Sequence, residues 1–131
     1  MKERDDDPIC LVVDDSEFDR KMIARAIRRA ELPFRIRVAT SLDELRKCMG
    51  HRRVKALILD NSLPDGRGID FAMRHVADPW FRPLLKIMVT DFPSPFIFEK
   101  SIQAGFGDVM LKSELSPAAM RAAFRIRSRL G

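Results

Sequence analysis

The sequence has few cysteines and no long apolar run, and both shortages narrow the class of protein. Its two cysteines, Cys10 and Cys48, match no metal-binding spacing and imply no disulfide-rich scaffold, so we interpret both as small core residues in a reducing cytoplasm. No apolar stretch approaches the roughly 20 residues that span a bilayer. The first eight residues lack the apolar core of a signal peptide. The sequence therefore predicts a cytoplasmic protein without membrane insertion.

Internal repeats, low-complexity tracts and domain linkers are also absent. The 131 residues are enough for one domain with a real core and too few for two ordinary domains. Hydrophobic residues make up 46% of the chain and charged residues 33%, which is typical of a soluble globular protein. The net charge of +5 neither requires nor excludes a polyanionic partner.

Five short apolar runs alternate with amphipathic helical patterns. We expect strands at residues 9–13, 34–39, 56–60, 84–89 and 109–111, each followed by a helix. Ser16 with Asp19, and Ser41 with Glu44, resemble capping boxes at two helix starts, and Ser94 before Pro95 is an N-cap candidate for a third. Such alternation predicts an α/β fold, a five-stranded doubly wound parallel sheet with five helices covering both faces. A closed barrel would need about 250 residues.

The third apolar run ends abruptly in Asp60, which is followed by the turn Pro64-Asp65-Gly66. Two interpretations are open for this carboxylate. It could simply start the turn, because Asp is a common turn residue. It could also belong to a site, because open parallel sheets place their ligand crevices at the carboxyl ends of strands.

Polar groups follow four of the five expected strands, at Asp14, Asp15, Asp60, Thr90, Asp91 and Lys112. Parallel strands end on the same side, so we expect these groups to converge. Clustered carboxylates repel one another unless a cation joins them, and oxygen ligands suit Mg²⁺. A lysine and a hydroxyl suit a phosphoryl group. The ordinary alternatives are helix capping by the paired aspartates, a strand-end hydroxyl, and a solvated lysine.

Four motifs in this order resemble the bacterial two-component response regulator receiver domain, of the stand-alone, chemotaxis-regulator-like kind. They are Val12-Val13-Asp14-Asp15-Ser16, Leu59-Asp60-x-x-Leu63-Pro64-x-Gly66, Thr90 and Lys112. The resemblance covers essentially the whole chain. It implies a flavodoxin-like receiver fold for residues 9–131 after a disordered N-terminal tail at residues 1–8.

The resemblance implies a phosphoryl transfer from a histidine kinase or phosphotransfer protein to Asp60. On that pattern the phosphoryl group would be held by Thr90 and Lys112. Mg²⁺ would be bound by Asp15 directly, by Asp14 through water, and by Asp60 and the backbone carbonyl of Ser62. The chain would not be an enzyme beyond its own phosphorylation and dephosphorylation, and it would signal through contacts with an unknown protein target.

Three positions depart from the family pattern. Asp91 stands where a small residue is usual, and its charge is expected to slow phosphorylation, restrict the donor or alter dephosphorylation. Ser113 replaces a proline that often follows a cis bond, so we predict a trans bond and a rearranged loop. Val109 replaces Tyr or Phe and is too stiff to swing inward, so a signal would use Phe92, Phe106 or the fourth helix.

Two other functions remain open on the sequence. The departures would fit a degenerate receiver that acts as an interaction module without phosphorylation. The second open function is that of an aspartate-nucleophile phosphatase, although such enzymes carry a second acid where this chain has Ser62.

The last helix raises a separate question about partners. Arg121, Arg125 and Arg129 form a basic stripe that is either a solvated face or a docking surface for an acidic partner. The sequence does not favour nucleic acid as a partner, since no reading helix or stacking platform is evident. Ile126 and Leu130 could form a homodimer contact through the last helices.

Overall fold

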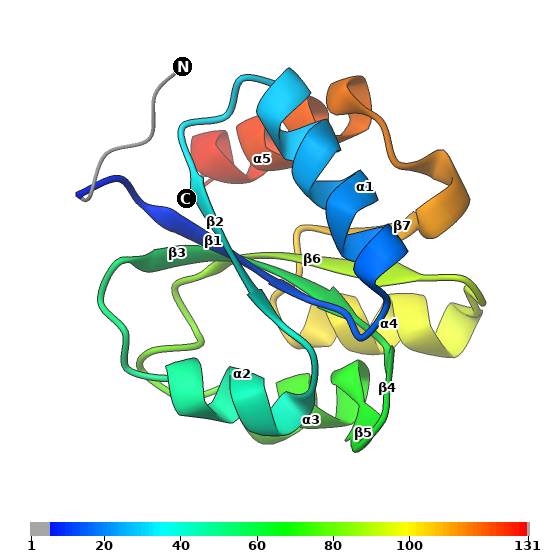
Figure 1. Cartoon of the computed structure of the whole chain (residues 1–131). Helices are drawn as coiled ribbons and strands as arrows, with labels where there is room; N and C mark the ends of the chain where they lie inside the picture. The colour runs from blue at the N-terminus through cyan, green and yellow to red at the C-terminus, as the bar shows by residue number, and fades with distance from the viewer. Residues whose placement is uncertain (1–5, 131) are drawn as a thin grey trace.

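A five-stranded parallel sheet forms the centre of the computed structural model, which describes residues 6–130 and the side chains of residues 6–124. The strands are β1 (Ile9–Val13), β2 (Arg35–Ala39), β3 (Val54–Asp60), β6 (Leu85–Thr90) and β7 (Asp108–Leu111). They lie in the order β2-β1-β3-β6-β7, with every neighbouring pair parallel (Figure 1). The predicted fold class is confirmed.

Helices cover both faces of this sheet. Figure 1 shows α1 (Glu17–Arg29) and α5 (Pro117–Leu130) on one side, and α2 (Leu42–Cys48), α3 (Gly68–Arg74) and α4 (Pro95–Gln103) on the other. The sequence did not predict two short features. One is the antiparallel hairpin of β4 (Ser62–Leu63) and β5 (Gly66–Arg67), and the other is the 3₁₀ turn η1 (Lys112–Glu114). None of the helices in the described range is long and apolar enough to cross a membrane.

Serine caps begin three of the helices, as the sequence predicts. The hydroxyls of Ser16, Ser41 and Ser94 each accept a hydrogen bond from the backbone N–H three residues later. Such caps satisfy a backbone donor that has no partner inside the helix. The carboxylate of Glu44 accepts from the N–H and hydroxyl of Thr40, one residue before the expected partner.

Apolar side chains on the two faces of the central strands form two cores. On one side Val12, Ile58 and Val89 pack with residues of α1 and α5. On the other, Leu57 and Leu59 pack with residues of α2, α3 and α4. Strand β2 pairs only with β1 and leaves Arg35 and Arg37 exposed, so it is an edge strand of the sheet. Burial on both faces explains why the inner strands are nearly continuous apolar runs.

Lys86 is the one charged exception within the inner strand β6. It is 2% exposed, and its Nζ donates to the backbone carbonyls of Phe81, Arg82 and Leu84 at 3.0, 3.1 and 3.0 Å. A buried ammonium needs such partners, because an unpaired one would be strongly destabilising. The sequence pattern marked this run only as apolar. In the structure these hydrogen bonds connect the loop before β6 to the sheet.

Candidate acidic site at the carboxyl edge of the sheet

The strand order reverses at β1, which has β2 on one side and β3 on the other. Ligand crevices of open α/β sheets lie outside the carboxyl ends of the strands at such a point. Asp14 and Asp15 directly follow β1, and Asp60 is the last residue of β3. One carboxylate oxygen from each of the three lies within 4.8 Å of the others. The structure therefore brings the three predicted acids together.

Lys112 reaches this cluster from the end of β7. Its Nζ lies 2.8 Å from Asp14 Oδ2, 2.8 Å from Asp19 Oδ2 and 3.2 Å from Asp60 Oδ2, and the residue is 7% exposed. The alternative of a solvated lysine at a strand end is therefore wrong. Lys112 is the positive charge at the centre of a group of carboxylates.

Asp19 is the site residue that the sequence analysis missed. We expected its carboxylate to close a capping box, but the side chain turns to Lys112 instead. The N–H of Ser16 is bound by Asp14 Oδ1 at 2.9 Å, so Asp14 supplies the contact expected of Asp19. Asp19 lies in the first turn of α1, three residues after the cap residue Ser16 and close in sequence to Asp14 and Asp15. This closeness to the acidic pair was the signal that could have identified it.

The three carboxylates differ in their surroundings. Asp14 is completely buried and Asp60 is 3% exposed, whereas Asp15 is open to solvent. Burial, together with the nearby charge of Asp14, raises the pKa of Asp60 to about 6, although Lys112 and the N–H of Ser62 oppose the rise. Burial by itself lowers the pKa of Lys112, but the carboxylates of Asp14, Asp19 and Asp60 raise it overall. The lysine is therefore charged at neutral pH.

These residues fit a divalent cation. Asp14 Oδ2 is buried, and its partner within the described part of the chain is Lys112, which also contacts Asp19 and Asp60. A carboxylate oxygen has two lone pairs, so Asp14 Oδ2 keeps capacity for a cation. A hard cation takes oxygen ligands of this kind and would also reduce the repulsion between Asp14 and Asp60. Asp14, Asp15 and Asp60 would offer only oxygen atoms as ligands to such a cation.

Thr90 and Asp91 lie at the end of β6 in different environments. Thr90 is 3% exposed, and its Oγ1 accepts from the N–H of Phe92 at 3.1 Å, which makes a local turn. Asp91 is exposed and has no ion pair or side-chain hydrogen bond among the described residues. Neither Lys112 nor an arginine therefore neutralises its charge.

The other two unusual positions lie around Lys112. The peptide bond before Ser113 is trans, as predicted, because the described residues contain no cis peptide. Residues Lys112–Glu114 form the η1 turn, and the rearrangement of this loop stays a prediction. Val109 is partly buried against the core on the α3 and α4 side. Lys112 still points at the acidic cluster despite the missing proline.

Two neighbours of Asp60 position the turn that follows it. Asn61 Oδ1 accepts from the N–H of Ile69 at 3.0 Å, and its carbonyl accepts from Gly68 at 2.9 Å, so the turn closes onto α3. The carboxylate of Asp65 accepts from the N–H groups of Leu42 and Asp43 at the start of α2, both at 2.9 Å. The N–H of Ser62 donates to Asp60 Oδ1 at 3.2 Å.

The basic stripe of the last helix falls mostly outside the described side chains. Arg121 is described, and its Nε donates to the carbonyl of Ala30 at 3.3 Å, which ties α5 to the end of α1. The predictions for Arg125, Arg129, Ile126 and Leu130 concern side chains outside the described residues. Residues 1–5 of the predicted tail also lie outside the described residues. Pro8, at the end of the predicted tail, accepts from the N–H of Arg35.

A doubly wound parallel sheet with carboxylates and a buried lysine at the carboxyl ends of its strands defines a class of α/β domains that bind ligands at that edge. Within that class, the model of the response regulator receiver domain matches residues 10–125, and the chain belongs to this family. The family consists of signalling domains of two-component systems. None of the curated protein sequences matches the chain.

Solved structures agree with this fold. The chain is similar to the receiver domain of a LuxO repressor protein from Vibrio parahaemolyticus, with a TM-score of 0.80, 20% identity, and coverage of 95% of this chain and 94% of that one. It is also similar to the chemotaxis response regulator CheY4 of Vibrio cholerae, with a TM-score of 0.72, 21% identity, and coverage of 95% and 98%.

A third similar structure carries ligands. It is a response regulator from Burkholderia pseudomallei with a phosphorylated aspartic acid, a calcium ion and citrate. Its TM-score is 0.74 at 18% identity, and the match covers 95% of this chain and 74% of that one. At such identities the three structures establish the shared fold alone.

Proposed function

We propose that this chain is a single-domain response regulator that accepts a phosphoryl group on Asp60 from a histidine kinase or phosphotransfer protein. The observation that carries the proposal is the contact of Lys112 with Asp60 beside the carboxylates of Asp14 and Asp15. The lysine offers positive charge where phosphoryl oxygens would lie, and the acids offer ligands for a cation. The output is a contact with a downstream protein.

The residues have separate roles in this transfer. A carboxylate oxygen of Asp60 attacks phosphorus, the N–P bond of the donor phosphohistidine breaks, and its electron pair stays on the imidazole nitrogen. Lys112 neutralises the phosphoryl oxygens, and the Thr90 hydroxyl donates to one of them. A pKa of about 6 leaves Asp60 ionised and nucleophilic at neutral pH.

Asp14, Asp15, Asp60 and the carbonyl of Ser62 are the ligands we propose for Mg²⁺. When bound, the ion supplies positive charge that offsets the negative charge of the acids and of the incoming phosphoryl group. Lys112 supplies a single positive charge, fewer than the negative charges of the three carboxylates that contact it. The cation is therefore needed for the site to accept an anion.

Incubation with a small phosphodonor and Mg²⁺ tests the proposal. We expect an intact-mass gain of one phosphoryl group in the wild type and no gain in Asp60→Asn, which has no nucleophilic carboxylate at this position. Asp65→Asn is a matched control, because it changes a neighbouring turn aspartate and should keep the gain. A wild type that gains no mass would support the degenerate receiver instead. Turnover of a generic phosphate ester would point to the phosphatase.

Two additional carboxylates are expected to limit the rate of phosphoryl uptake. Asp91→Ala removes an unpaired charge beside Thr90, and Asp19→Asn frees Lys112 from a 2.8 Å ion pair. We expect both variants to gain the phosphoryl group faster than the wild type, with the larger effect for Asp19, because it directly holds the lysine. The measurement is the time course of mass gain, followed by its decay after donor removal. Unchanged rates in both would show that these charges do not matter.

The signal must leave this site by a route other than Val109. Phe92, directly after Asp91, is 81% exposed, and Phe96 and Phe98 on α4 are more than half exposed. Phe106 is 4% exposed and packed in the core. We therefore propose that Phe92 and α4, rather than Phe106, carry the change to a partner.

A further inference from the structure

Positive charge is concentrated in one part of the chain. Residues 20–53 contain 11 Lys and Arg against three Asp and Glu, a net charge of +8 (11 minus 3) compared with +5 for the whole chain. This segment runs from α1 through the edge strand β2 to the turn before β3. A field of one sign raises the local concentration of anions. The segment therefore identifies where an anionic ligand would collect.

Part of this charge surrounds a cavity at the amino ends of the strands, on the edge of the sheet opposite Asp60. The cavity has a volume of about 360 Å³, and we call it the arginine pocket. Three segments line it, namely Ile9 of β1, the β2 residues Arg35, Ile36 and Arg37, and the turn residues His51, Arg52 and Arg53. Among the residues that the structure describes, no Asp or Glu lines this pocket.

Backbone contacts join the three segments at the arginine pocket. The N–H of Ile9 donates to the carbonyl of Arg53, and the N–H of Arg35 donates to that of Pro8, both at 2.8 Å. His51 Nδ1 accepts from the N–H of Arg53 at 3.2 Å. A neutral imidazole that accepts at Nδ1 carries its proton on Nε2, so His51 offers a donor to a ligand.

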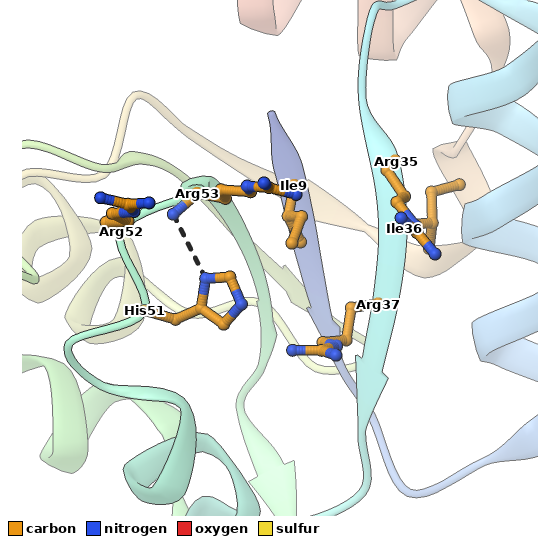
Figure 2. Close-up of a pocket in the computed structure, with 7 residues that line it drawn as sticks. All are labelled: Ile9, Arg35, Ile36, Arg37, His51, Arg52 and Arg53. Carbon is orange, nitrogen blue, oxygen red and sulfur yellow. Dashed lines mark hydrogen bonds between the residues drawn. The ribbon is translucent and has the colours of Figure 1, made fainter. Parts of the chain in front are cut away.

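The cationic side chains approach this space from two sides. Figure 2 shows Arg37 extending from β2 toward the His51 turn, and Arg53 extending from the turn toward Ile9. Arg52 points away to the other side of the turn. The like charges of Arg37 and Arg53 repel each other across this cavity, and a bound anion would relieve that repulsion.

We propose that the arginine pocket binds a small anion carrying two or more phosphoryl groups. Guanidinium groups pair with phosphate oxygens in a forked geometry, and here they reach the cavity from two separate segments. A volume of this size suits a small ligand rather than an extended chain. Ile9 and Ile36 add apolar surface for an organic part of the ligand.

Inorganic pyrophosphate is the probe for this proposal, used with a chelator so that no divalent cation is present. Without a cation the acidic cluster around Asp60 repels anions, so binding reports the arginine pocket. Trp80 is the single tryptophan, and its Nε1 donates to the carbonyl of His51 at 3.0 Å, so its fluorescence should change on binding. Calorimetry at about 150 mM salt gives the affinity, with long-range attraction screened.

Paired variants separate a pocket from a diffuse basic surface. We expect the double variant Arg37→Gln, Arg53→Gln to weaken pyrophosphate binding by about tenfold or more. The control is Arg25→Gln, Arg28→Gln, which removes the same charge from the groove along α1 and should change binding less than about twofold. Thermal melts would verify that both doubles fold.

Three results would overturn the proposal. Equal weakening in the two double variants would mean diffuse attraction only. Orthophosphate binding as tightly as pyrophosphate would reject the requirement for two phosphoryl groups. No fluorescence or calorimetric response at millimolar pyrophosphate would reject the site. Binding of ADP more tightly than pyrophosphate would support a role for Ile9 and Ile36. None of these outcomes depends on whether Asp60 is phosphorylated.

Discussion

Gly68→Ala is expected to be less stable than the wild type by about 1–3 kcal/mol, and to take up the phosphoryl group more slowly. A Cβ at this position would lie 2.5 Å from the backbone carbonyl oxygen of Asp60 and 3.0 Å from Leu59 Cγ. The first contact is with main chain of the central strand, which does not move aside as a flexible side chain would. A displacement of this main chain by the added Cβ would therefore move Asp60, the proposed phosphoacceptor.

Helix propensity acts in the opposite direction but is smaller. Gly68 begins α3, and alanine is favoured over glycine inside a helix by up to about 1 kcal/mol, with less at the first position. The steric clash with the Asp60 carbonyl should therefore have the larger effect on stability. Denaturant unfolding gives the stability difference, and the mass-gain time course gives the rate.

Gly50→Ala is the matched control for Gly68→Ala. Gly50 has a φ of +92°, and nothing lies within 4 Å of an added Cβ, so this variant introduces backbone strain without a collision. We expect a loss of about 1–2 kcal/mol and an unchanged rate of phosphoryl uptake. A normal rate and stability in Gly68→Ala would contradict the proposed contact with Asp60.

Asp60→Asn is expected to be more stable than the wild type by about 1–2 kcal/mol at pH 7 in the absence of divalent cations. Burial raises the pKa of Asp60 to about 6 in the folded protein, from an ordinary value of 3.8. The folded state therefore holds this proton more tightly than the unfolded state does. Stability from this group is present below about pH 4 and is lost as the pH rises through 6.

The pH dependence and the cation provide two checks on this prediction. The advantage of Asp60→Asn should shrink toward zero as the pH falls from 7 to 4, because both proteins then carry a neutral side chain. Added Mg²⁺ should stabilise the wild type more than the variant, since ligand binding to the folded state adds stability. Denaturant melts with and without a chelator measure both effects. A variant less stable than the wild type at pH 7 would contradict the destabilising role of ionised Asp60.

Local patterns in the sequence were sufficient for the elements and for most of the site. Apolar runs ending in acids marked β1 and β3, and serine caps marked the starts of α1, α2 and α4. Because parallel strands end on one side, the positions of Asp14, Asp60 and Lys112 along the chain were enough to predict that they meet. These features depend on neighbours close in sequence or on one rule of sheet geometry.

Other features required the packed structure because their partners are distant in the chain. Asp19 was assigned to a cap, yet it pairs with Lys112, 93 residues away. Lys86 was counted within an apolar run, yet its ammonium is satisfied by carbonyls of the preceding loop. The close approach of the Asp60 backbone carbonyl to Gly68 explains why a side chain is excluded at position 68.

The sequence by itself determined the doubly wound sheet and the identity of the acids and lysine at its carboxyl edge, because periodicity and strand ends are local properties. Tertiary structure alone decided which charged side chains contact one another. It placed the carboxylates of Asp14, Asp19 and Asp60 around Lys112. It also gathered arginines from β2 and the turn before β3 around one cavity. Charges act through space, so their partners depend on how the chain is folded.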